Sequence, residues 1–158
     1  MYERVLIPLD GSELAESILP FAEKLAGPLD AEILLLRVVE PLSTAAALAN
    51  GDVVGPDGLF LEQVRAKEYL SNLQERLGER GLRARSVLGL GVPATEIVEH
   101  AKAHKADLIA MSTHGRSGFG RLVFGSVAEE VLRTAPVPVL MIRMVARKAA
   151  SPVEVRTS

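Results

Sequence analysis

The sixteen residues from Met111 to Ser126, MSTHGRSGFGRLVFGS, combine the residue types that bind phosphate groups. They comprise four glycines, three serines, two arginines and one histidine among sixteen residues. Glycines can adopt positive φ and let backbone N–H groups converge on an anion. A helix beginning at Ser126 would add free amides and a favourable dipole. The composition therefore indicates either a phosphate-binding loop or a plain connection between a strand and a helix.

Neither of two common phosphate-binding motifs fits this stretch. A P-loop needs a lysine after its second glycine, and no lysine occurs between residues 106 and 147. The dinucleotide motif G-x-G-x-x-G fails because Val123 stands where the third glycine belongs. No G-x-S-x-G elbow surrounds Ser117 or Ser126, so a hydrolase triad is unsupported. Ser126 and Glu129 also form S-x-x-E, so Ser126 has an alternative role as a helix cap without a ligand.

Hydrophobic periodicity predicts alternating strands and helices around this loop. We expect strands at residues 4–10, 31–40, 82–91, 106–112 and 136–143. We expect helices at residues 12–27, 59–81, 93–105 and 126–135, the first capped by Ser12 and kinked or delayed by Pro20. Such alternation predicts a doubly wound α/β domain, which binds ligands beyond the carboxyl ends of its strands. We expect one domain over residues 1–144, with an irregular insertion at about 41–58 and a polar tail at 145–158.

The bulk composition excludes several classes of partner. The net charge is −2 and the 158 residues include no tryptophan, two tyrosines and four phenylalanines, which argues against nucleic-acid binding. Cysteine is absent, and there is neither an eighteen-residue apolar run nor a secretory leader pattern. We therefore expect a cytoplasmic protein that has no membrane span. His100 and His104 have a zinc-compatible spacing, but without further ligands we interpret them as surface histidines.

Several motifs together resemble the universal stress protein family over about residues 3–143. The family's nucleotide signature is Gly, two residues, Gly, nine residues, Gly and then Ser or Thr. Gly115, Gly125 and Ser126 match the last three positions, and Ser112 replaces the first glycine. The stretches LIPLDGS, GVPATEI and APVPVLMIR match as well.

The resemblance implies a Rossmann-like, five-stranded parallel sheet of order 3-2-1-4-5, with helices on both faces. It also implies ATP or another adenine nucleotide, with or without Mg²⁺, in the gap between the first and fourth strands. By residue, it places Pro8 and Asp10 beside the ribose and adenine, the Val38 backbone at the adenine, Met111 and Ser112 at the sugar and α-phosphate, and Gly115, Gly125, Ser126 and Val127 at the phosphates. Family members dimerise through the fifth strand, here Val137 to Arg143, which predicts a homodimer.

Three of the side chains at this site have alternative roles. The Asp10 carboxylate can accept both hydrogens of a ribose diol, or it can act as a helix cap or turn residue. Ser112 would crowd the sugar and phosphate if the family's glycine is needed for close approach. We favour ordinary β geometry, in which the hydroxyl fits and adds a hydrogen bond. Arg116 can pair with phosphate bidentately, although loop arginines are more often solvated.

Three functions follow from these residues. The first is a nucleotide-binding regulatory or stress-resilience protein without robust turnover, because no general base or lysine clamp for a transferring phosphate is evident. The second is an ATP-cleaving or adenylyl-transferring enzyme, which PLDGSE at residues 8–13 does not support. The third is a family member that binds no nucleotide and acts through protein contacts, an alternative raised by Ser112.

Overall fold

Five parallel strands form one sheet in the computed structural model, which describes residues 2–41, 56–115 and 125–145. The strands are β1 (Arg4–Leu9), β2 (Glu32–Val39), β3 (Ala84–Leu90), β4 (Leu108–Gly115) and β5 (Val139–Val145). Their order is β3-β2-β1-β4-β5, and all four neighbouring pairs are parallel. The predicted fold class and strand order are confirmed.

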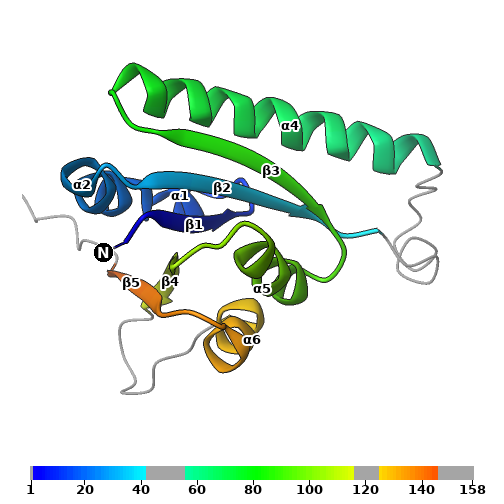
Figure 1. Cartoon of the computed structure of the whole chain (residues 1–158). Coiled ribbons are helices and arrows are strands. Elements are labelled where there is room, and N and C mark those ends of the chain that lie inside the picture. The colour runs from blue at the N-terminus through cyan, green and yellow to red at the C-terminus, as the bar shows by residue number, and fades with distance from the viewer. Residues whose placement is uncertain (1, 42–55, 116–124, 146–158) are drawn as a thin grey trace, which may run out of the picture.

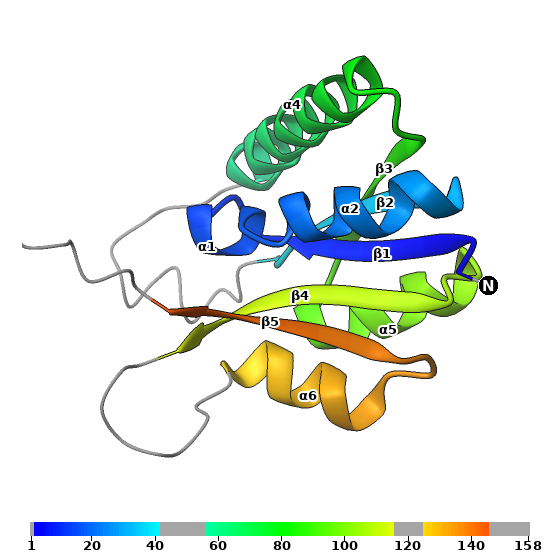
Figure 2. The same cartoon turned by 90° about the vertical axis from the view of Figure 1, so that its left-hand side faces the viewer.

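Helices cover both faces of this sheet. They are α1 (Glu13–Glu16), α2 (Leu19–Leu29), α4 (Pro56–Glu79), α5 (Pro93–Ala103) and α6 (Ser126–Thr134). Figures 1 and 2 show α1, α2 and α4 on one side and α5 and α6 on the other. The connections that follow β1 and β2 therefore cross one face, and those that follow β3 and β4 cross the other. This reversal between β1 and β4 makes the sheet doubly wound and creates its topological switch point.

Alternating residues of the central strands feed two separate cores. In β2, Ile33 and Leu35 pack with α2 and α4, whereas Leu34 and Leu36 pack with α5 and α6. All four side chains are fully buried. A strand buried on both faces needs apolar side chains at every position, which explains the continuous run ILLL. The predicted α4 stripe of Ala66, Leu70, Leu73 and Leu77 is buried, as are Ile97, Val98 and Ala101 of α5.

Several element boundaries differ from the predicted ones. The first predicted helix is interrupted: α1 ends at Glu16, and α2 begins at Leu19 with Pro20 in its first turn, where a missing N–H costs nothing. It continues past Gly27 to Leu29. Helix α4 begins at Pro56 rather than at residue 59 and ends at Glu79, and the rest of the predicted insertion, residues 42–55, lies outside the described residues.

Replacing the central Leu35 by Ala tests the two-sided core. Leu35 is fully buried and pairs with Ile7 of β1 and Ser86 of β3. Leu35→Ala should lower the free energy of unfolding by about 2–5 kcal/mol, measured by urea denaturation. The matched control is Leu90→Ala, because Leu90 is 48% exposed and its replacement should cost less than about 1 kcal/mol. Equal losses for the two variants would contradict the assignment of the core.

Candidate functional site

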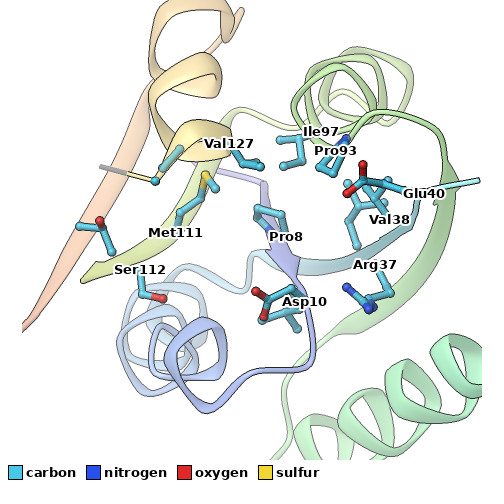
Figure 3. A pocket seen from close by; sticks show the side chains of 15 residues that line it. Pro8, Asp10, Arg37, Val38, Glu40, Pro93, Ile97, Met111, Ser112 and Val127 are labelled. Atoms are coloured by element: carbon cyan, nitrogen blue, oxygen red, sulfur yellow. The ribbon is translucent and has the colours of Figure 1, made fainter. Parts of the chain in front are cut away.

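A cavity of about 350 Å³ opens at the carboxyl ends of β1, β2 and β4 (Figure 3). Residues of β1, β2 and β4 contribute most of its wall, and residues of α5 and α6 and of the segments that adjoin the strands and α6 contribute the remainder. The lining residues are Pro8, Leu9, Asp10, Leu36, Arg37, Val38, Glu40, Pro93, Ile97, Met111, Ser112, Thr113, Gly125, Val127 and Ala128. The cavity thus lies at the switch point, where α/β sheets bind their ligands.

The cavity exists because β1 and β4 stop pairing halfway along. Their register comprises Val5↔Leu108 and Leu6↔Ile109, although both strands continue beyond these pairs. The Arg4 carbonyl accepts from the Asp107 N–H at 3.0 Å, so its backbone faces β4. Since backbone direction alternates along a strand, residues 6 and 8 face β4 as well. Pro8 has no N–H to donate there, and the ladder ends at Leu6.

Asp10 follows β1 and is held by the turn into α1. Its Oδ1 accepts hydrogen bonds from the Ser12 N–H at 2.9 Å and the Ser12 hydroxyl at 2.6 Å. The predicted cap, Ser12, is confirmed, since its hydroxyl also accepts from the Ala15 N–H. Asp10 is consequently not the helix cap but an anchored turn residue whose carboxyl lines the cavity.

The ionised form of Asp10 is favoured at this position. Burial, the largest influence, raises its pKa, but the Ser12 hydrogen bonds and the Arg37 charge outweigh it, so the net pKa is lowered. Arg37 extends from β2 toward Asp10, as Figure 3 shows. Sequence reasoning missed Arg37 and also Glu40, because their positions depend on β2 lying next to β1 in the sheet. The periodicity of β2 alone marks only a buried strand.

Met111 and Ser112 lie on the β4 side of the cavity. Ser112 pairs with Ile142 of β5, so the expected β geometry is confirmed. Its hydroxyl donates a hydrogen bond of 2.5 Å to the Leu14 carbonyl and thereby ties β4 to α1. The hydrogen bond that the Ser112 hydroxyl adds is therefore donated to the protein backbone. Thr113 also lines the cavity, and its side chain is buried.

The amino terminus of α6 opens into the cavity through Gly125, Val127 and Ala128. Helix α6 begins at Ser126 as predicted, but the alternative role of Ser126 as the helix cap is wrong, because Gly125 is the N-cap residue. The Glu129 N–H binds the Gly125 carbonyl at 2.9 Å as an ordinary helical bond. The first amides of a helix have no partner within it, and no side chain of the described residues caps them, so this end presents N–H donors to the cavity.

Glycine at position 125 is not required by the backbone geometry. Its φ is −64° and its ψ is 158°, so Gly125 does not use the positive φ that glycine permits. A Cβ built at Gly125 would meet no atom of the described residues within 4 Å. The part of the protein that the structure describes would therefore tolerate a larger residue. The absence of a side chain leaves open space at the end of α6.

Of the remaining predicted site residues, Val38 lines the cavity and the others do not appear in its described lining. Gly115 is the last residue of β4, paired with Val145, and it is not among the described lining residues. Ser126 is likewise absent from the described lining. Arg116 lies outside the described residues, as do Arg121 and the two intervening glycines.

His100 and His104 do not form a metal centre with other described residues. Their rings stack with centroids 5.4 Å apart, and both side chains are half-buried rather than fully exposed. Within residues 2–41, 56–115 and 125–145, no group of three or more potential ligand side chains gathers to hold a metal ion. None of the helices in these ranges is both long and apolar enough to cross a membrane.

A doubly wound parallel sheet with an open crevice at its switch point defines an α/β protein of the Rossmann-like type. The sequence pattern of the Universal stress protein family matches residues 1–143, and this chain belongs to that family. Universal stress protein MJ0531 of Methanocaldococcus jannaschii is 35% identical over 143 residues, which cover 90% of this chain and 83% of the relative.

Solved structures show the same fold. The protein MJ0577 of Methanocaldococcus jannaschii has a TM-score of 0.72 and 26% identity, covering 92% of this chain and 99% of that one. A universal stress protein in complex with cAMP has a TM-score of 0.66 at 23% identity, covering 90% and 97%. The Archaeoglobus fulgidus universal stress protein in complex with dAMP has a TM-score of 0.62 at 22% identity, covering 89% and 97%.

The acidity of Asp10 predicts how stability changes with pH. Because its folded-state pKa is lowered, its ionised form stabilises the fold above the unfolded pKa of about 3.9, and this contribution is lost as the pH falls. Asp10→Asn should therefore be less stable than the wild type near neutral pH by less than about 1 kcal/mol, since the group is solvent-screened. Urea denaturation at decreasing pH should show this difference shrinking below about pH 4. A difference that grows on acidification would contradict the assigned direction.

Proposed function

We propose that this protein binds an adenine nucleotide, ATP in the first place, at the switch-point cavity and acts as a nucleotide-dependent regulatory or stress-resilience factor in the cytoplasm. The observation that carries the proposal is the amino terminus of α6, which no side chain of the described residues caps and which opens into the cavity beside Gly125. Backbone N–H groups and the helix dipole favour a phosphate at such an end. Space at Gly125 permits an oxygen to approach these groups closely.

The rest of the cavity suits a nucleoside. Its volume of about 350 Å³ falls in the usual range for small-molecule pockets. Ile97 and Pro93 of α5 and Val38 of β2 provide apolar wall for an adenine ring, and the Val38 backbone offers hydrogen-bonding groups to its edge. Asp10, across the cavity from Val127 in Figure 3, provides a carboxylate for ribose hydroxyls. Phosphate at α6 and sugar at Asp10 give the nucleotide one orientation.

Regulation rather than rapid turnover is supported by the side chains available. The described lining includes neither a lysine to clamp a transferring phosphate nor a histidine to act as a base. The Asp10 Oδ1 is engaged by Ser12, which suits binding better than proton abstraction. Two solved structures of the same fold are complexes with cAMP and dAMP, so this fold accommodates adenine nucleotides. With Mg²⁺ bound to the phosphates, the same orientation would apply.

Replacing Gly125 by Val tests the phosphate site. The new side chain would occupy the space at the α6 terminus, so ATP affinity measured by titration calorimetry should fall more than tenfold, the equivalent of about 1.4 kcal/mol or more. The matched control is Gly78→Val, since a Cβ at Gly78 also meets no described atom within 4 Å and Gly78 lies in α4, away from the cavity. Its ATP affinity should equal that of the wild type. Unchanged affinity in folded Gly125→Val would contradict the site.

The assembly that we propose is a homodimer formed through β5. This strand lies at the edge of the sheet and pairs with β4 on one side only among the described strands. Residues Val139–Ile142 are apolar, and an apolar edge strand invites pairing with a second copy. Sedimentation equilibrium should give about twice the 16.9 kDa mass of the chain. A monomer mass over a wide concentration range would contradict this assembly.

A further inference from the structure

Arg37 has hydrogen-bonding capacity that the described protein does not use. It lies near the carboxyl end of β2, lines the nucleotide cavity, and its side chain is 22% exposed. Its closest carboxylate is that of Glu62 on α4, with Nη2 and Oε1 3.9 Å apart, which is beyond hydrogen-bond distance. It donates no hydrogen bond to any of the described residues. A guanidinium carries five donors, so this group has donors to offer to a ligand.

Asp10 offers the complementary acceptor next to it. Oδ1 accepts both hydrogen bonds from Ser12, and within the described part of the chain Oδ2 accepts none. Arg37 lies in β2 and Asp10 directly follows the neighbouring strand β1, and Figure 3 shows the Arg37 guanidinium extending to the side of Asp10. The positive charge of Arg37 acts on that carboxylate. Among the described residues, the cavity wall thus holds an acceptor on Asp10 and several donors on Arg37 that have no hydrogen-bond partner.

This pairing matches the chemistry of a ribose diol. Each hydroxyl both donates and accepts a hydrogen bond, whereas a carboxylate only accepts and a guanidinium only donates. We propose that Arg37 is a specificity-determining residue that, together with Asp10, selects ribonucleotides over 2′-deoxyribonucleotides. The hydroxyl hydrogens would bind Asp10, and the oxygen of the 2′-hydroxyl would accept from Arg37. This inference rests on the proposed function, since it assigns the sugar preference of the same cavity.

The loss of the 2′-hydroxyl would leave donors of Arg37 without a partner in a partly buried wall. Hydrogen bonds to charged groups contribute more than neutral ones, and a site that recognises a hydroxyl rejects the analogue that lacks it. The wild-type protein should therefore bind ATP about tenfold more tightly than 2′-deoxyATP. A residue that only pairs with Glu62 would produce no such ratio.

The experiment is titration calorimetry of the full chain with ATP and with 2′-deoxyATP. Arg37→Gln should weaken ATP binding to about the level of 2′-deoxyATP, which reduces the affinity ratio to about threefold or less, and should leave 2′-deoxyATP binding unchanged. The matched control is Arg65→Gln, because Arg65 is an exposed α4 residue outside the nucleotide cavity whose replacement removes the same charge. It should keep the wild-type ratio. Thermal unfolding of each variant establishes that it is folded.

Two results would overturn the role of Arg37 while leaving the proposed function intact. One is equal wild-type affinity for the two nucleotides. The other is a ratio in Arg37→Gln that equals the wild-type ratio, including a common loss of affinity for both nucleotides, which would mean that only the charge of Arg37 acts. If the wild-type protein binds neither nucleotide, the proposed function fails and this inference fails with it.

Discussion

The early end of the pairing between β1 and β4 is the constraint on which the candidate site depends. A strand between two neighbours normally donates to both along its whole length, and β1 does so toward β4 only as far as Leu6. Beyond that point β1 keeps pairing with β2, through Pro8↔Leu36 and Leu9↔Arg37. On the β2 side, β1 is thus paired to its end, whereas on the β4 side the two strands are unpaired beyond Leu6. The opening separates Pro8 and Asp10 from Met111 and Ser112, and the cavity lies between them.

The double winding of the sheet keeps this opening accessible. Helices α1 and α2 follow β1 onto one face, whereas α6 follows β4 onto the opposite face. Within residues 2–41, 56–115 and 125–145 no helix crosses over the gap between the two strands, and the amino terminus of α6 lies beside it. The hydrogen bond from Ser112 to the Leu14 carbonyl fixes α1 against β4 and so sets the distance between the two walls. Hydrogen-bond donors at the start of α6 and the acceptor carboxylate of Asp10 after β1 thereby line the same cavity.

The sequence predicts the fold and the strand side of the site well, because both depend on local patterns. Continuous apolar runs mark buried parallel strands, and Pro8, Asp10 and Met111 adjoin strand ends that any doubly wound sheet brings to one edge. Arg37 could not be predicted, since its role requires knowing that β2 lies beside β1. The partner of Ser112 lies 98 residues away in the chain, and no spacing rule identifies it.

The capping pattern at the start of α6 did not predict the cap residue that the structure has. S-x-x-E at Ser126 satisfies the capping pattern, but the structure shifts the cap one residue earlier to Gly125. A serine cap would have placed its own oxygen on the free amides of the helix, whereas glycine leaves them available. The strand β4 likewise extends to Gly115, three residues beyond its predicted end, because pairing with β5 continues through Val145. Pairing with β5, rather than local propensity, decides where β4 ends.

The most direct test of the central claim is an amide chemical-shift titration of the full-length protein with ATP. The amides of Val127 and Ala128 at the start of α6 and of Asp10 after β1 should shift in a saturable manner and with a common affinity. Amides on the far side of α4, such as that of Glu75, should stay unchanged. Saturable shifts confined to residues outside the cavity, or no shifts at any accessible ATP concentration, would contradict a nucleotide site between β1 and β4.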